Sequence, residues 1–156
     1  MQQHATLMEG TFMNEADLRS AARSRGRPIQ LLASFSAAYF TGALLTDLAY
    51  WQTLNVMWER FSIWLILAGL IFAGFATVAY VIGLASSRQI DRPPLSTVVG
   101  YVLAVLLSVV NAFLHSRDAY TAVVPTGLML SGLVVVVLLL TAWVDTAPAN
   151  RTRIGG

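Results

Sequence analysis

Hydrophobic residues along the chain fall into four long runs that short polar segments separate. The runs cover Ile29–Tyr50, Ser62–Leu84, Thr97–His115 and Ala122–Val144. Each run has close to the roughly 20 mostly apolar residues that a membrane-spanning helix needs. The pattern therefore predicts an all-α membrane protein with four transmembrane helices.

The three segments between these runs predict how the helices are connected. WQTLNVMWER contains charged and aromatic residues, SSRQIDRPPLS contains a Pro-Pro pair, and HSRDAYT is short and polar. A proline pair ends a helix, because proline lacks the backbone N–H and clashes with the preceding turn. Connections this short make consecutive helices antiparallel. We therefore expect one antiparallel four-helix bundle.

The positions of the arginines predict the orientation of the bundle. All ten basic residues are arginines, and in a four-span topology both termini and the middle connection lie on one side. That side carries eight of them: Arg19, Arg23, Arg25, Arg27, Arg88, Arg92, Arg151 and Arg153. The opposite side carries Arg60 and Arg117. The positive-inside rule therefore places both termini in the cytoplasm. Aromatic residues gather toward the opposite boundary, as in an interfacial belt: Tyr50, Trp51, Trp58, Trp64 and Tyr120.

This topology divides the chain into three parts. Residues 1–28 form a cytoplasmic segment, residues 29–145 the transmembrane domain and residues 146–156 a cytoplasmic tail. In the first part Asn14 is placed to cap a short helix that lies on the membrane surface or docks to a partner, with acids in its first turn and arginines at its end.

Composition narrows the classes of function. Only 12% of the residues are charged, against about 25% in a soluble domain. The absence of cysteine excludes disulfides and thiolate metal sites. A net charge of +2, without a clustered basic face, gives no reason to expect a nucleic-acid partner. The expected surroundings are the lipid bilayer and other membrane proteins.

Small residues at helical spacing indicate where helices approach closely. In lipid, helix association depends on small residues and interhelical hydrogen bonds. The candidates are Ser34, Ala38 and Gly42 in the first run, Gly69 and Ala73 in the second, and Gly127 and Ser131 in the fourth. These positions serve either the bundle itself or a contact with another subunit, including a second copy of the chain.

Polar residues on two of the helices are expected to meet near the outer boundary. Ser108, Asn111, His115 and Asp118 share one face of the third helix, and Ser36, Tyr39, Ala43 and Asp47 share one face of the first. Both helices run outward, so Asp47 and His115 lie at similar depth, with Arg60 and Arg117 nearby. The leading interpretation is a structural ion pair of Asp47 with Arg117 or Arg60. The alternatives are a proton-handling Asp47–His115 pair or the edge of a quinone site, and a purely interfacial cluster.

A haem site is a further hypothesis, because four-helix membrane bundles often hold haem between two histidines. The histidines here are His4 and His115, which the topology places on opposite sides of the membrane. Within one protomer they do not reach the same iron. His115 with Met129, or a haem shared across a dimer axis, stays open. A second histidine near His115 is missing, so we expect no metal site.

Three stretches resemble a bacterial family of four-helix membrane proteins, the domain of unknown function DUF2231, with the alphaproteobacterial branch the most similar. They are SFSAAYFTGALLTDLAYWQT, MWERFSIWLILAGLIFAG and NAFLHSRDAYTAVVPTGLMLSGL, within a resemblance that covers roughly residues 27–145. The resemblance implies a bacterial inner-membrane location. Asp47 and Arg117 match an aspartate and an arginine of the family. Many members carry a His-Pro pair and a second histidine in helix one, where this chain has Arg27-Pro28 and Ala33 to Ser36.

The missing histidines argue against a haem site, if those residues hold a cofactor in relatives. Members of the family are often encoded near cytochromes c and quinoprotein sugar dehydrogenases, which implies a role beside electron transfer. The apolar surface, the short connections and the lack of a catalytic constellation predict a non-catalytic subunit that anchors or stabilises a larger inner-membrane complex, and the resemblance implies that this complex is redox-active. The alternative is a quinone- or haem-binding redox module at the Asp47–His115 end. A small transporter is less favoured, since no helix carries polar residues along its whole length. No catalytic motif supports an enzyme.

Overall fold

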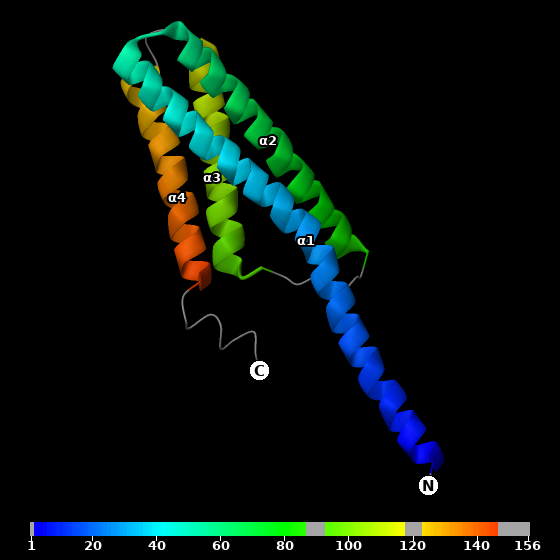
Figure 1. The fold of residues 1–156 in the computed structure, drawn as a ribbon. Coiled ribbons are helices and arrows are strands. Elements are labelled where there is room, and N and C mark those ends of the chain that lie inside the picture. The colour runs from blue at the N-terminus through cyan, green and yellow to red at the C-terminus, as the bar shows by residue number, and fades with distance from the viewer. Residues whose placement is uncertain (1, 87–92, 118–122, 147–156) are drawn as a thin grey trace.

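The protein is all-helical in the part of the chain that the structure describes. The computed structural model describes residues 2–86, 93–117 and 123–146, and side chains within 28–86, 93–116 and 125–146. The elements are α1 (Gln2–Thr53), α2 (Val56–Ala85), α3 (Leu95–Arg117), a π-helical turn η1 (Val123–Gly127) and α4 (Leu128–Thr146). They form an antiparallel four-helix bundle (Figure 1).

Among the residues that the structure describes, four helical segments are long and apolar enough to cross a membrane, as the sequence predicts. They are Pro28–Thr53, Val56–Ala85, Leu95–Ser116 and Pro125–Thr146. The main difference from the sequence prediction is the start of α2, which begins at Val56 rather than at Ser62. The charged and aromatic residues of this region are compatible with a helix, and the true break consists of Leu54 and Asn55 alone.

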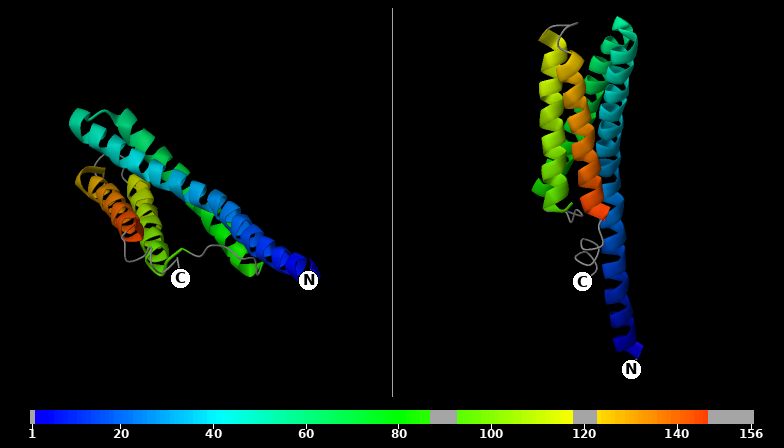
Figure 2. Two further views of the ribbon diagram at one scale, coloured as in Figure 1. Left: turned by 60° about the horizontal axis from the view of Figure 1, so that its bottom comes forward. Right: turned by 90° about the vertical axis from the view of Figure 1, so that its left-hand side faces the viewer.

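The first helix continues beyond the bundle on its N-terminal side (Figure 2). α1 has 52 residues and includes Pro28, whereas a span of the hydrocarbon layer takes about 20. The short helix expected near Asn14 is thus part of α1 and not a separate element. The boundary at residue 28 between a cytoplasmic segment and the transmembrane domain stays a prediction.

A two-residue connection joins α1 to α2. Leu54 adopts a left-handed backbone conformation with φ of 53°, which turns the chain out of α1. Its N–H still donates to the carbonyl oxygen of Tyr50 at 2.7 Å, so the last turn of α1 is closed by a hydrogen bond. Asn55 caps α2, because its side chain accepts from the backbone N–H of Met57 at 3.0 Å. The end of the bundle at which α1 and α3 end and α2 and α4 begin is called the turn end here.

The short turn fixes which residues of α1 and α2 face each other. Residues equally far from the Leu54–Asn55 turn are buried in pairs along the two helices. The pairs are Tyr50 with Glu59, Asp47 with Ser62, Ala43 with Ile66, Phe40 with Gly69, and Ser36 with Ala73. α3 and α4 show the same arrangement, with Asn111 level with Ser131 and Ser108 level with Val134.

The two hairpins meet along a small apolar core. Phe40 of α1, Ala104 of α3 and Val134 of α4 are buried against one another, and Leu70 of α2 packs on them. Most other large apolar side chains are exposed on the outside of the bundle. This distribution fits a membrane protein, whose outer surface faces lipid.

Small residues permit the close contacts between the helices, although the first helix uses a different face from the expected one. Ser34 and Ala38 are exposed, whereas Ser36, Phe40, Ala43 and Asp47 are buried. Gly42 faces α2, since a Cβ atom there would lie 3.5 Å from Leu65. Gly69, Ala73, Gly127 and Ser131 are all buried, as expected.

The contact of Gly69 with Phe40 generates a prediction. A Cβ atom on Gly69 would lie 2.6 Å from the Phe40 ring, and that ring is enclosed in the core. Gly69→Ala therefore lowers stability by about 1–3 kcal/mol, the usual cost of overpacking. Gly74→Ala on the same helix meets nothing within 4 Å and gains up to about 1 kcal/mol from helix propensity. Thermal unfolding in mild detergent measures both, and equal effects would contradict the packing.

Candidate functional site

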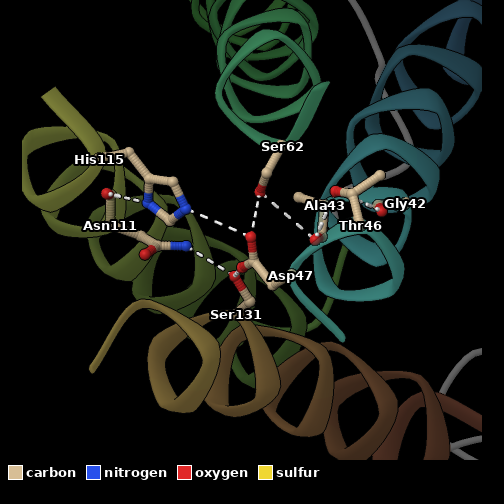
Figure 3. A network of polar contacts seen from close by, with 8 residues as sticks. All are labelled: Gly42, Ala43, Thr46, Asp47, Ser62, Asn111, His115 and Ser131. Atoms are coloured by element: carbon tan, nitrogen blue, oxygen red, sulfur yellow. Dashed lines mark hydrogen bonds and ion pairs between the residues drawn. The ribbon is translucent and has the colours of Figure 1, made fainter. Parts of the chain in front are cut away.

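Polar side chains from the other three helices converge on the carboxylate of Asp47, near the turn end (Figure 3). Asp47 has no exposed surface. Ser62 of α2 donates to its Oδ1, Ser131 of α4 donates to its Oδ2, and Nε2 of His115 on α3 lies 3.3 Å from Oδ1. One α1 side chain thus contacts each of the other three helices.

Two consecutive hydrogen bonds connect Asn111 of α3 to this carboxylate through Ser131 of α4. The single hydroxyl proton of Ser131 goes to Asp47, so the Ser131 oxygen is left to accept from elsewhere. Asn111 Nδ2 supplies that bond at 2.8 Å. The chain fixes the amide orientation of Asn111, because its nitrogen and not its oxygen must face Ser131. Asn111 Oδ1 is buried and has no donor among the described residues.

The imidazole of His115 is held on three sides. Its Nδ1 lies 3.0 Å from the carbonyl oxygen of Asn111, one helical turn earlier, and its Nε2 faces Asp47. Gly127, at the end of η1, packs against the third side, and a Cβ atom there would lie 2.9 Å from Cε1 of the ring. A residue without a side chain is therefore required at position 127.

Burial makes these contacts energetically important. The side chains of Asp47 and His115 are fully enclosed, and an unpaired charge inside a membrane bundle costs several kcal/mol. A carboxylate is tolerated there when donors surround it. Two hydroxyl groups and an imidazole meet this requirement. Glu59 is also nearly buried, at 5% exposure, and lies one helical turn from Ser62 toward the turn end.

The structure brings together some of the residues selected from the sequence and separates others. Asp47, Asn111 and His115 lie in one network. Arg60 is exposed, and the ion pair shown for Asp47 within the described side chains is with His115. The expected Asp47–Arg117 pair and Asp118 lie outside the described side chains, as does His4. Met129 is 71% exposed, on the opposite face of α4 from Ser131.

For two residues of the network, the sequence pattern predicts a role other than the one they have in the structure. The sequence pattern indicates Ser131 as a small packing residue and places Ser62 at the start of a span, yet both donate to Asp47. The signal that identifies Ser62 is the turn itself. Once Leu54 and Asn55 are recognised as a two-residue connection, Asp47 and Ser62 are equally far from it and must lie level.

Comparison with known proteins gives one match. The model of a family described as a predicted membrane protein, DUF2231, matches residues 28–155. No curated protein and no solved structure matches the chain. The matched region contains all four spans and every residue of the Asp47 network.

Removing Ser131 is predicted to break two bonds of the network at once. Ser131→Ala leaves Asp47 Oδ2 without this donor and Asn111 Nδ2 without its acceptor. We expect a loss of about 1–3 kcal/mol, typical of a buried hydrogen bond to a charged group. Ser34→Ala is the matched control, because exposed Ser34 donates only within its own helix. Unfolding in detergent is the measurement, and equal losses would refute the role of Ser131.

A methyl group at position 127 is predicted to displace His115. Gly127→Ala places a Cβ atom 2.9 Å from Cε1, so the ring must rotate away from Asp47. We expect a loss of about 1–3 kcal/mol from the overpacked site, together with a changed imidazole NMR signal. Gly132→Ala, in the α4 helix that follows η1, meets nothing within 4 Å and is the control. An unchanged His115 signal in Gly127→Ala would rule out this contact.

Proposed function

Because the chain belongs to the DUF2231 family of predicted membrane proteins, we propose that it is a non-catalytic integral subunit of a larger membrane complex with a redox function. Its task in this proposal is to anchor or stabilise that complex. It resides in the bacterial inner membrane, with both termini in the cytoplasm. The orientation follows from the eight arginines on the side of the termini.

The observation that supports this proposal is how the polar side chains of the core are used. Asp47, Ser62, Ser131 and Asn111 bond with one another and hold four helices together. Within the described ranges, no group of three His, Cys, Asp or Glu residues is arranged to hold a metal ion. Large apolar side chains are exposed on each of the four spans. A rigid bundle with an apolar surface suits a subunit that other membrane proteins pack against.

The environment of His115 disfavours haem or another metal at this residue. A ligand histidine needs a free ring nitrogen, but both nitrogens of His115 face acceptors within the bundle. Met129, the second ligand considered, points away from the network. The proposal therefore includes no cofactor bound by His115. Redox chemistry, in this account, belongs to the other subunits.

Part of the outer surface permits close approach of another helix. Ser34 and Ala38 are small, exposed and one turn apart on α1, and Gly74 on α2 is exposed with open space around it. Small residues at four-residue spacing let two membrane helices approach closely. If a partner subunit packs on α1, Ala38 is on the contacted face.

Purification from native membranes in mild detergent tests the proposal. We expect the tagged protein to co-purify in fixed stoichiometry with subunits of a redox complex. A photo-crosslinking residue at Ala38 should capture one of these subunits, whereas the same residue at Phe113, exposed on α3, serves as a control for random collision. Deletion of the gene should lower the yield of the assembled complex. A protein that purifies alone, with unchanged yields of the complexes, would contradict the proposal.

A further inference from the structure

The hydrogen bonds of His115 determine where its protons lie. The Asn111 carbonyl oxygen accepts and never donates, so the Nδ1 that lies 3.0 Å from it carries a proton. The second ring nitrogen, Nε2, lies 3.3 Å from Asp47 Oδ1. Two atoms that are both acceptors when unprotonated do not attract each other, so a contact between them requires a proton. The Asp47–His115 contact therefore contains one proton that either partner is able to carry.

The hydrogen bonds of Ser62 and Ser131 to Asp47 are compatible with two protonation states of the Asp47–His115 pair. With the proton bound it is either imidazolium with carboxylate or imidazole with carboxylic acid, and in both forms its net charge is zero. Without the proton the pair carries one negative charge on Asp47. The hydroxyl groups of Ser62 and Ser131 donate to this carboxylate in that state as well. The two serine bonds to Asp47 are therefore kept whether or not the proton is present, while the direct Asp47–His115 hydrogen bond forms and breaks with the proton.

Glu59 offers a connection from this pair to the turn end. It is 5% exposed and lies one helical turn beyond Ser62, level with the buried Tyr50 of α1. Arg60, the next residue, is exposed. The described residues of η1 and the first turn of α4 contribute no ionisable side chain, while the side chains of Arg117 and Asp118 lie outside those described.

We propose that Asp47 and His115 form a proton-exchange site. The pair binds one proton between Asp47 Oδ1 and His115 Nε2, and exchanges it with the aqueous phase at the turn end through Glu59. In the uptake step a proton from the aqueous phase reaches the pair by way of the Glu59 carboxyl group, which afterwards returns to its starting state. Release is the reverse. This site goes beyond the anchoring role and does not depend on any partner subunit.

Nitrogen NMR of the two histidines tests the site directly. Protein labelled with ¹⁵N-histidine in lipid nanodiscs gives signals from two imidazole rings, each with two nitrogens, and His4→Gln leaves the two ring nitrogens of His115 alone. We expect Nδ1 to stay protonated while Nε2 changes reversibly with pH in the folded protein. In Asp47→Asn the Nε2 response should disappear while Nδ1 remains protonated. A neutral His115 with the proton on Nε2 and none on Nδ1 would overturn the proposal, as would a ring that does not respond to pH.

The connection through Glu59 needs a second readout, the rate of proton exchange at Nε2. We expect Glu59→Gln to slow this exchange by roughly 100-fold, as loss of a positioned proton donor does, with the fold unchanged. Asp145→Asn is the matched control, because this carboxylate lies at the opposite end of the bundle, bonded to Thr97. Equal rates in Glu59→Gln and Asp145→Asn would overturn the role of Glu59. Failure of the anchoring proposal would leave these NMR results unaffected.

Discussion

A carboxylate buried inside a membrane bundle must be surrounded by hydrogen-bond donors, and this constraint organises the whole structure. Asp47 has no exposed surface, and in lipid a charge without partners costs several kcal/mol. Its donors come from α2, α3 and α4. A shift of any of these helices by one residue would rotate its donor away. Asp47 therefore links the positions of four helices whose apolar surfaces alone would associate only weakly in lipid.

The short connections between the helices explain why this convergence is possible. A two-residue turn after α1 places Asp47 level with Ser62, and Phe40 level with Gly69. The second hairpin likewise places Asn111 level with Ser131. Local geometry thus aligns the residues within each hairpin, and the Asp47 network then aligns one hairpin with the other.

The sequence predicted the features that follow from composition and helical periodicity. The four spans, the polar face of α1 that contains Ser36 and Asp47, and the polar face of α3 that contains Asn111 and His115 all depend on one helix at a time. Which residues bond to Asp47 depends instead on how two helices are aligned with each other. Hydrophobic length alone does not locate the turn at Leu54 and Asn55, so it does not identify Ser62 as a donor to Asp47. Charge complementarity favours an arginine as the partner of Asp47. Serine hydroxyl groups are less conspicuous in a sequence, and their burial costs less desolvation free energy than the burial of a charged group.

The same network supports both proposals, in different ways. As a structural element it holds an apolar bundle in one arrangement, which suits an anchoring subunit. In the second proposal the network also holds an exchangeable proton, and Ser62 and Ser131 continue to donate to Asp47 when that proton leaves. A subunit that binds a proton beside a redox complex would connect its own stability to the protonation state at one side of the membrane.

The distance between Asp47 and His115 in the membrane tests the central claim most directly. Solid-state NMR on protein that carries ¹³C at the aspartate carboxyl carbons and ¹⁵N in histidine measures it, with His4→Gln to isolate His115. The account predicts a carboxyl carbon about 4 Å from Nε2, as a hydrogen-bonded pair requires, and loss of this coupling in Asp47→Asn. No measurable coupling, or a coupling that persists in Asp47→Asn, would contradict it.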